Sequence, residues 1–505
     1  MSQALCTVIH HELTSGGAYE NVSACMVVKR ASQLNLRQER ALPLLCGLPK
    51  MHKNPFGWRF LALSGKCATK PASQVLSKLL TCILETLREK NDHFLLETGI
   101  RRFFIISDPF EATDFLASWR RKAEIRQLHT FDFSTMYTTI PLEDLCTRLN
   151  RVIDEAFDSR PEAKYENMIE ASMSRGRAAS ASWVDSKSSS HTKSSQIFSS
   201  KEVKDLVYFV VMNTFILNGG KLKRQKIGIP MGTNSAPNIT NLYLYSYESD
   251  YIDLLVKEGC EDQAQQFNGT FRLIDDCLSV DNPLHSVFAI PLEKGGVYPA
   301  SLTCSETSSC MDTVNFCGAE ISGTETGFRI SVYDKKKDFP FAVKSYPHTD
   351  SNIPRTVAYS AFVGQLNRFY RICNHPDDFI KEAVELASYL IQNNGCTMRI
   401  VKHKFSSFLR KTVRGKYHTK LKTLKHQFET GCTQAPAPGS PDPGSRPPGQ
   451  KGTILKPAHP TLKQQAPMSP KNKPKIAQGD NQRFRAVWSK EWEAKVEAQE
   501  PGIGS

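Results

Sequence analysis

Two adjacent acids, Asp275 and Asp276, lie in the stretch FRLIDDCLSV (residues 271–280), where apolar residues flank them on both sides. This pattern predicts two short strands joined by a tight turn, with both carboxylates at its tip. Hard cations such as Mg²⁺ prefer oxygen ligands held on a rigid frame, so such a turn suits metal binding. An isolated pair of aspartates is more often a solvated turn, so the metal interpretation depends on the rest of the chain.

A third acid, Asp132, lies in LHTFDF (residues 128–133), which has the pattern of a strand that ends on a carboxylate. The chain then enters a helix predicted over 142–157, with Pro141 at its start, where proline is tolerated. Phosphoryl transfer by two metal ions about 4 Å apart requires a cluster of acids held in this way. One ion would lower the pKa of an attacking 3′-hydroxyl, and the other would steady a triphosphate and the departing pyrophosphate.

A nucleoside triphosphate carries several negative charges, so a site of this kind needs a basic element facing it. The candidates are Arg59, Lys66 and Lys70, with Lys50 and Lys53 beside them. Each alone could be an ordinary surface cation. A template–primer duplex also needs a smooth wall, and the loop 228–237 could supply it, because glycine lets a backbone come close to a ligand. Taken alone, the same loop could be an ordinary turn before a helix.

Hydrophobic periodicity predicts the elements that must position these residues. An apolar run over 42–53 ends in a basic loop with proline, and residues 58–63 then alternate like a strand. Helices are predicted over 72–90, 109–119, 201–217, 238–251 and 358–408, and short strands near 313–334. In the stretch 172–200, 12 of 29 residues are serine, which predicts a mobile insertion that forms no core.

The composition of the 505 residues is that of a globular protein with a basic balance. Lys and Arg number 65 against 51 Asp and Glu, a net charge of +14, which favours a polyanionic partner: nucleic acid first, an acidic membrane surface second. The 14 cysteines form no CxxC pair, so a zinc site or a disulfide framework is not expected. No signal pattern or bilayer-length apolar run occurs, which predicts an intracellular protein without a membrane partner. The expected location within the cell is the nucleus.

Several motifs occur in the order found in the palm of reverse transcriptases: Asp132 with an aromatic five residues later, the GIPMGTNSAP loop, and IDD after an apolar run. More narrowly, the chain resembles the reverse transcriptases of Penelope-like retroelements, which are related to telomerase reverse transcriptase. The segments that carry this resemblance are LPKMHK, FDFSTMYTTIP, IGIPMGTNSAPNITNLYLYSYE, FRLIDD and VYDKKKDFPF, within residues 42–408. The resemblance implies an α+β right-hand polymerase fold with fingers, a palm built on an antiparallel sheet, and a helical thumb.

The resemblance also implies a role for each matched position. Asp132, Asp275 and Asp276 would be the catalytic carboxylates that bind two Mg²⁺ ions, for which Mn²⁺ could substitute. The ring of Tyr137 would lie under the sugar and leave no room for a ribose 2′-hydroxyl, although a half-buried tyrosine after a strand is the alternative. The residues that would contact template or nucleotide are Met231, Gly232 and Pro237, with Arg59 reaching the triphosphate.

The sequence departs from these relatives at three places. Leu273 stands two residues before Asp275, where relatives often carry an aromatic. At Phe316-Cys317-Gly318 relatives read more like Phe-Leu-Asp, so the grip on the primer differs here. No GIY…YIG endonuclease motif follows the polymerase motifs, and a Pro-rich stretch occupies that place, so target cleavage by this chain is not expected.

The expected organisation is an unassigned segment (1–41), fingers and palm (42–345), a basic helical thumb (346–430) and a Pro-rich, disordered basic tail (431–505). Residues 399–425 contain ten Lys and Arg and no acid, which predicts contact with phosphate backbones. The candidate nucleic-acid-binding residues are Lys50, Lys53, Lys402, Lys404, Arg410, Lys411, Arg414 and Lys416.

The expected function is that of an RNA-directed DNA polymerase, which transfers deoxynucleotides from dNTP to the 3′-hydroxyl of a DNA primer on an RNA template. Two alternatives stay open. The chain could be a decayed or domesticated relative that grips nucleic acid without polymerising. It could also be an RNA-dependent RNA polymerase, which Tyr137 disfavours because its ring would exclude a 2′-hydroxyl. The sequence does not indicate a protein partner.

Overall fold

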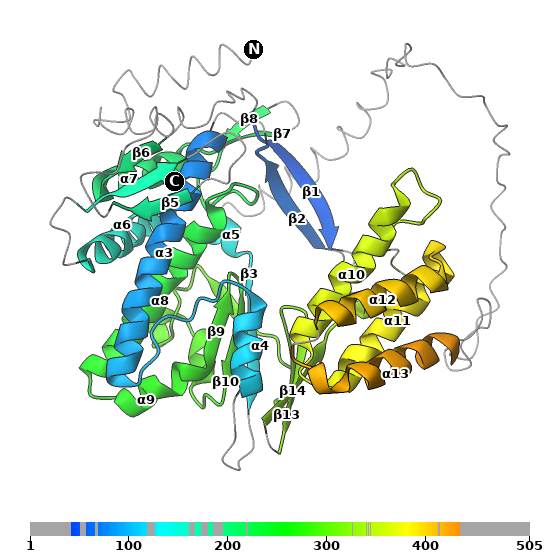
Figure 1. Cartoon of the computed structure of the whole chain (residues 1–505). Helices are drawn as coiled ribbons and strands as arrows, with labels where there is room; N and C mark the ends of the chain where they lie inside the picture. The colour runs from blue at the N-terminus through cyan, green and yellow to red at the C-terminus, as the bar shows by residue number, and fades with distance from the viewer. Residues whose placement is uncertain are drawn as a thin grey trace, which may run out of the picture. The chain divides into compact units, whose positions relative to one another are not determined.

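The structure is a computed structural model in which helices and sheets are mixed (Figure 1). It describes residues 42–50, 57–65, 69–118, 127–160, 167–172, 180–184, 195–218, 221–325, 327–339, 341, 343, 345–412 and 415–434. The expected N-terminal segment and Pro-rich tail lie outside these residues, apart from the start of the tail at 431–434. The described residues between 42 and 218 and between 222 and 434 belong to one compact unit, and the sites described below lie within it.

A four-stranded antiparallel sheet carries the predicted acids. Its strands are β3 (Leu128–Ser134), β9 (Thr270–Leu273), β10 (Asp276–Val280) and β11 (Thr303–Glu306), in the order β11-β3-β10-β9. The predicted pair of strands around the Asp-Asp motif is confirmed, with one correction. The tight turn consists of Ile274 and Asp275, because Asp276 pairs with Leu273 and is already the first residue of β10.

Two hydrophobic cores lie on opposite faces of this sheet, because side chains alternate along each strand. Phe131 and Cys277 belong to the first core, while Leu128 and Leu278 belong to the second. The first core is completed by helices α3 (Lys70–Thr98), α6 (Leu142–Asp158), α7 (Ser200–Met212) and α8 (Ala236–Lys257). The second core is shared with α4 (Pro109–Ser118) and a sheet of β12 (Thr313–Phe316), β13 (Ala319–Thr324) and β14 (Gly327–Val332).

The predicted helices are confirmed, but one of them is shorter than its apolar pattern indicates. The helix predicted over 201–217 is α7, which ends at Met212 after starting with a capping box of Ser199 and Glu202. Residues Phe215–Asn218 form strand β7 instead, and Leu217 N–H donates to the Pro43 carbonyl at 2.8 Å. Pairing with another strand therefore overrides the helical pattern at this end.

A basic hairpin forms from the region predicted as an apolar run and loop. Strands β1 (Leu44–Lys50) and β2 (Gly57–Leu63) pair along their whole length. Pro49 and Lys50 therefore belong to a strand and not to the predicted basic loop, whose remaining residues 51–53 lie outside the described residues. The sheet continues through β7 to β8 (Lys221–Arg224), in the order β2-β1-β7-β8. Pro49 is tolerated in β1 because β7 pairs with this strand only near Leu44, at its other end.

The serine-rich stretch is partly ordered, so the prediction of a coreless insertion is wrong for its described residues. Strands β4 (Ile169–Ser172), β5 (Ser180–Trp183) and β6 (Ser195–Phe198) form a sheet in the order β5-β4-β6. The Trp183 ring packs edge-on against Phe157 at 4.7 Å between centroids, and its N–H donates to Thr86 Oγ1 at 2.7 Å. Two large aromatic residues, Trp183 and the fully buried Phe198, therefore anchor strands that are otherwise rich in serine.

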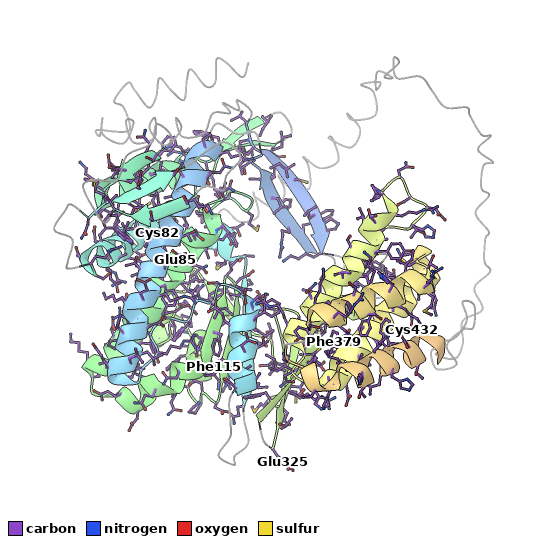
Figure 2. All side chains as sticks on the ribbon, in the orientation of Figure 1. Cys82, Glu85, Phe115, Glu325, Phe379 and Cys432 are labelled. Carbon is purple, nitrogen blue, oxygen red and sulfur yellow. The ribbon has the colours of Figure 1, made fainter. Side chains whose placement is uncertain are left out.

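The C-terminal helices predicted over 358–408 are α10 (Arg355–Ile372), α11 (Pro376–Asn394) and α12 (Met398–Lys411), and α13 (Leu421–Gln434) follows. Figure 2 labels Phe379 among these helices, where it is fully buried. The Phe405 and Phe428 rings stack with centroids 3.8 Å apart and join α12 to α13. The shorter helices are α5 (Met136–Thr139), α9 (Glu261–Gln265), η1 (Gln266–Gly269), η2 (His285–Phe288), η3 (Leu292–Lys294), η4 (Lys335–Asp338) and η5 (His418–Lys420).

None of the helices in the described part of the chain has the length and apolar content needed to span a bilayer.

Candidate functional site

The three acids singled out in the sequence meet at one end of the four-stranded sheet. Asp132 in β3 lies directly opposite Asp276 in β10, and Asp275 occupies the adjoining turn. All three line a cavity of about 930 Å³. Like charges directly opposite each other on paired strands destabilise a sheet, so this arrangement favours a bound cation. The donor set consists of carboxylate oxygens, which is the set that Mg²⁺ or Mn²⁺ prefers.

Strained backbone surrounds these acids. Four described residues other than glycine have a positive φ, and three of them lie beside the cluster: Thr135 (60°), Ile274 (58°) and Cys317 (48°). A β-branched residue such as Ile274 pays about 1–2 kcal/mol for this conformation. Strain of this kind persists where the surrounding structure enforces it, and it concentrates at functional sites.

A buried arginine, Arg272, forms a hydrogen bond to the backbone of the strained turn. Arg272 is fully buried and donates to both carboxylate oxygens of the fully buried Glu248, at 2.5 and 3.0 Å. It also donates to the Ile274 carbonyl at 3.1 Å and to Asn241 Oδ1 at 2.9 Å, while Tyr298 O–H donates to Glu248 at 2.8 Å. These interactions fix the backbone next to Asp275. Neither member of the Arg272–Glu248 pair was predicted, because nothing in a single sequence marks a charged residue as buried.

The acids affect one another's ionisation. Burial against the protein, together with the neighbouring Asp275 and Asp132 charges, raises the pKa of Asp276 to about 6, although solvent reaches its carboxylate through the open cavity. The Cys317 thiol lies 3.5 Å from Asp276 Oδ2 and stabilises the charged form. A carboxylate with a raised pKa gains most from a divalent cation, because the ion removes the repulsion that raised it.

The loop 228–237 forms one wall of the cavity and is tied to three other segments. Ile229 N–H donates to the Tyr137 carbonyl at 2.8 Å, and Ala62 N–H of β2 donates to the Met231 carbonyl at 2.8 Å. Ser235 Oγ lies 2.9 Å from Ser73 Oγ of α3. A side chain at position 228 would collide with the Tyr137 carbonyl oxygen, and the φ of +78° there also requires glycine. The predicted contact residues all line the cavity: Tyr137, Met231, Gly232 and Pro237.

The basic hairpin also lines this cavity, next to the loop, but the structure separates the predicted cations into groups. Arg59 and Lys50 line the cavity. Lys70 does not, and its ammonium donates instead to the Gly65 carbonyl at 2.7 Å. The expected nucleotide contact of Lys70 therefore has no support in the cavity lining. Lys66 and Lys53 lie outside the described residues.

The predicted C-terminal cations that the structure describes line neither the cavity of the acids nor a second cavity, of about 530 Å³, between α10, α11 and the end of β14. Helix α12 buries Val401 and Phe405 on its inner side, and its cations lie toward solvent. Lys402 and Lys404 are half-buried, while Arg410, Lys411 and Lys416 are exposed. Arg414 lies outside the described residues.

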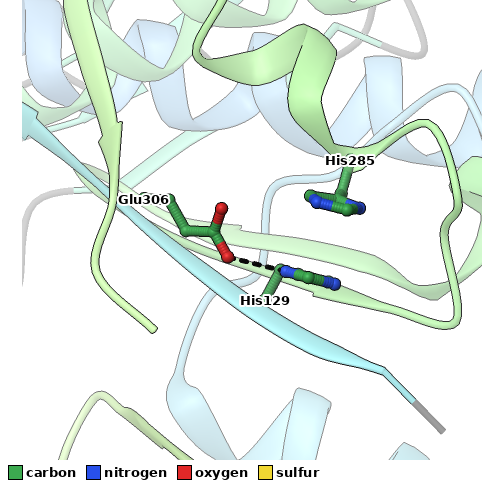
Figure 3. A group of neighbouring side chains, drawn as sticks. All are labelled: His129, His285 and Glu306. Atoms are coloured by element: carbon green, nitrogen blue, oxygen red, sulfur yellow. Dashed lines mark hydrogen bonds and ion pairs between the residues drawn. The ribbon is translucent and has the colours of Figure 1, made fainter. Parts of the chain in front are cut away.

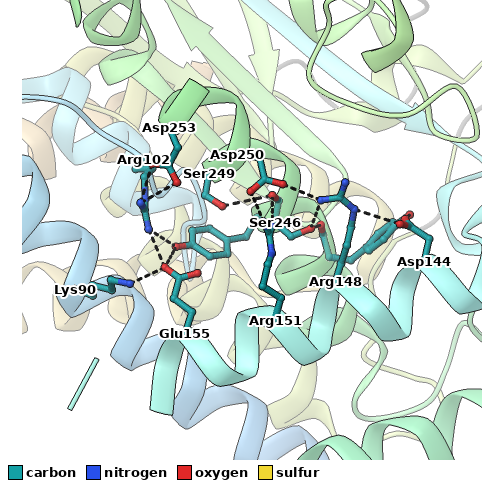
Figure 4. Close-up of polar contacts among 12 residues, drawn as sticks. Lys90, Arg102, Asp144, Arg148, Arg151, Glu155, Ser246, Ser249, Asp250 and Asp253 are labelled. Atoms are coloured by element: carbon teal, nitrogen blue, oxygen red, sulfur yellow. Dashed lines mark hydrogen bonds and ion pairs between the residues drawn. The ribbon is translucent and has the colours of Figure 1, made fainter. Parts of the chain in front are cut away.

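A network of ion pairs and hydrogen bonds joins α6 to α8, the helix that follows the loop 228–237 (Figure 4). Arg148 of α6 pairs with Asp250 of α8 at 3.0 Å and with Asp144 of α6 at 3.3 Å. Arg102 binds Glu155 of α6 at 2.8 Å. Because α8 begins at Ala236, at the end of the loop, these pairs fix the helix that carries Pro237. This network was also not predicted, since its members come from segments far apart in the sequence.

A second group of potential ligands, His129, His285 and Glu306, lies on the other face of the sheet from Asp132 (Figure 3). His129 Nδ1 lies 2.7 Å from Glu306 Oε1, and its ring stacks on that of His285 with centroids 3.5 Å apart and planes 8° apart. A metal ion lies in the plane of each imidazole that binds it, so two parallel stacked rings do not converge on one ion. Burial alone would raise the pKa of Glu306, but hydrogen bonds from His129 and Ser308 outweigh burial and lower it. The group joins β3 to β11 and η2.

Searches of protein-family models and of curated proteins found no match to the chain. Among solved structures, telomerase from Candida albicans in complex with a fragment of telomeric RNA is similar with a TM-score of 0.45 and 12% identity, over 80% of this chain and 66% of that chain. Apo telomerase from Candida tropicalis gives 0.40 and 12%, over 76% and 58%. The RNA-dependent RNA polymerase of BmCPV at its elongation state gives 0.35 and 12%, over 70% and 26%. The chain thus spans less than two thirds of the length of these proteins.

Proposed function

We propose that the chain is an RNA-directed DNA polymerase with a right-hand architecture. The palm is the sheet β11-β3-β10-β9, the fingers comprise the β1–β2 hairpin with the elements around α3, and the thumb is α10 to α13. The observation that carries the proposal is the meeting of Asp132, Asp275 and Asp276 in one cavity that Arg59 also lines. The sequence resemblance to reverse transcriptases supports the choice of RNA template, DNA primer and dNTP.

The three carboxylates would hold two divalent ions, Mg²⁺ or Mn²⁺. Asp276 adjoins both other acids, as the strand partner of Asp132 and the neighbour of Asp275, and the resemblance to reverse transcriptases favours Asp275 as the ligand of both ions. Ions bound there would lower the pKa of the attacking 3′-hydroxyl and neutralise charge on the triphosphate. The chain itself positions the reactants. Arg59 and Lys50 bind the triphosphate, and Met231 and Gly232 support the new base pair.

Tyr137 would select deoxynucleotides. Its ring lines the cavity beside the acids, and its backbone is fixed by the Ile229 N–H donation. Burial, followed by the charge of Asp275, raises the pKa of the Tyr137 hydroxyl, so this side chain is neutral at physiological pH. A ring fixed in this position leaves no space for a ribose 2′-hydroxyl.

The test is primer extension on an RNA template, with deoxynucleotides or ribonucleotides supplied separately. Deoxynucleotide incorporation by the wild type, absent in Asp275→Asn, is the expected result. Product from Asp275→Asn would remove the metal-site assignment, and extension with ribonucleotides alone would make the protein an RNA polymerase. Binding of primer–template without any extension would favour a protein that grips nucleic acid and no longer polymerises.

A further inference from the structure

The second cavity lies between α10, α11 and the segment that follows β14, and the proposed function gives it no role. Its volume of about 530 Å³ falls within the range of roughly 300–1,000 Å³ that is usual for small-molecule sites. Charged groups of both signs and two aromatic rings line it together: Lys336, Tyr346, Arg368, Glu382, Glu385 and Tyr389. The cavity therefore combines hydrogen-bond donors, acceptors and flat apolar surface.

The donors come mainly from Arg368 of α10, which is half-buried. Its Nη1 contacts Gln365 Oε1 at 3.4 Å, and its Nη2 donates to the Gly318 carbonyl at 3.2 Å. A guanidinium has more N–H donors than these two contacts use, and among the described residues no carboxylate pairs with it. A Cβ at position 318 would meet Nη2 at 2.6 Å, so the glycine there makes room for this contact. Arg368 thus lines the cavity in a supported position, with N–H donors left for a ligand.

The acceptors come from α11. Glu382 is half-buried and Glu385 is exposed, and their spacing of three residues makes them neighbours on the helix surface. A carboxylate has about four lone-pair sites, so each can accept hydrogen bonds from a ligand in addition to its interactions within the protein. Two different helices therefore supply the arginine donors and the carboxylate acceptors of one cavity.

The aromatic surface is formed by Tyr346 and Tyr389, whose ring centroids lie 6.1 Å apart with planes at 68°. The Tyr346 carbonyl accepts a hydrogen bond from Asn394 at 2.5 Å, which ties this residue to the end of α11. The Lys336 ammonium lies 5.2 Å from the Tyr346 ring centroid and pairs with Asp334 at 3.3 Å. These contacts hold the rings in place, and a planar ligand can stack on such a surface.

The two signs of charge restrict the class of ligand. The carboxylates of Glu382 and Glu385 repel a phosphate, and the Arg368 guanidinium repels an ammonium group. A neutral, planar group with acceptors on one edge and donors on another matches both helices. Guanine is such a group, because its O6 and N7 accept a bidentate arginine. Its N1–H and its 2-amino group lie side by side and can donate to a carboxylate, whereas adenine has no such pair of donors.

We propose that the second cavity binds an unpaired guanine base, with Arg368 on its O6 and N7 and a glutamate of α11 on its N1–H and 2-amino group. The base has to be unpaired because the carboxylate occupies the edge that would pair with cytosine. Either single-stranded nucleic acid or a free guanine nucleotide can supply such a base, with its sugar and phosphate outside the cavity. The inference goes beyond the proposed function and does not require polymerase activity.

The test measures the binding of GMP and AMP to the full chain by isothermal titration calorimetry. EDTA is present, so that nucleotide held by metal ions at the acid cluster does not contribute. The wild type should bind GMP at least about tenfold more tightly than AMP, since a bidentate base contact discriminates by this much. Arg368→Met should lose the preference. Arg355→Met, which changes an exposed arginine at the start of the same helix, should keep it.

Two analogues separate direct contact from lost packing. 7-Deaza-GMP lacks the N7 acceptor and should bind the wild type about fivefold more weakly than GMP, whereas Arg368→Met should bind both alike. IMP lacks the 2-amino group and should also bind the wild type about fivefold more weakly. The double variant Glu382→Gln with Glu385→Gln should bind IMP and GMP alike. Because each comparison uses one folded protein and two ligands, a loss of stability does not imitate the result.

Uridine-rich single-stranded RNA with one guanosine, compared with the same RNA carrying adenosine, distinguishes the two sources of the base. A guanine preference in the RNA alone would assign single-stranded nucleic acid as the ligand, and a preference for GMP as well would admit the free nucleotide. Equal binding within both pairs, GMP with AMP and one RNA with the other, would overturn the proposal. An unchanged guanine preference in Arg368→Met would overturn it as well.

Discussion

The buried pair of Arg272 and Glu248 should dominate the stability of the sheet that carries the acids. Both side chains are fully buried, and Arg272 also donates to Asn241 and to the Ile274 carbonyl. Replacing Arg272 by Met leaves the Glu248 carboxylate without its cation in a site that excludes water. The expected cost is about 3–5 kcal/mol, because an unpaired buried charge loses its partner and regains no hydration. This is a large part of the roughly 5–15 kcal/mol that usually stabilises a domain.

Urea unfolding followed by circular dichroism measures this cost, and the chain offers an internal control. Arg329 and Asp378 also form a bidentate ion pair, with nitrogen–oxygen distances of 2.9 and 2.8 Å. The Arg329 side chain, however, is 55% exposed. Arg329→Met should cost no more than about 1 kcal/mol, since water replaces the lost partner. The double variant Arg272→Met with Glu248→Leu should be more stable than Arg272→Met alone, because it removes both charges. Equal costs for Arg272→Met and Arg329→Met would refute the reasoning.

Three further predictions concern the cavity. Because the pKa of Asp276 is raised to about 6 in the folded protein, stability falls as the pH rises from the ordinary carboxyl pKa of 3.8, and the cost is complete only above about pH 6. Asp276→Asn should therefore raise the melting temperature of the metal-free protein more at pH 8 than at pH 5, and an equal shift at both pH values would contradict the raised pKa. Tyr137→Ala should lower discrimination against ribonucleotides at least about tenfold in competitive incorporation assays, and unchanged discrimination would remove this role from the ring. Gly228→Ala should cost about 3 kcal/mol in denaturant unfolding, since its Cβ would meet the Tyr137 carbonyl at a positive φ, and a cost below about 1 kcal/mol would count against that contact.

Local patterns were sufficient to predict the strands of Asp132 and of Asp275-Asp276, because alternation and turn residues act over a few positions. The proximity of these acids followed from motif order, and the structure adds that Asp132 and Asp276 are cross-strand partners. The buried Arg272 could not be predicted, since its burial depends on Glu248, a residue of a different element. Composition alone would assign the serine-rich stretch to a mobile insertion, but packing of Trp183 against other elements orders part of it.

The central claim is that Asp132, Asp275 and Asp276 together hold the divalent ions, and direct ion binding tests it without requiring turnover. Mn²⁺ titration followed by electron paramagnetic resonance, in the presence of primer–template and dNTP with a 3′-deoxy primer end, counts the bound ions. We predict saturable binding of two ions by the wild type, and loss of at least one of them in Asp275→Asn, with duplex binding retained. Unchanged Mn²⁺ binding in Asp275→Asn would contradict the assignment of these acids as the metal site.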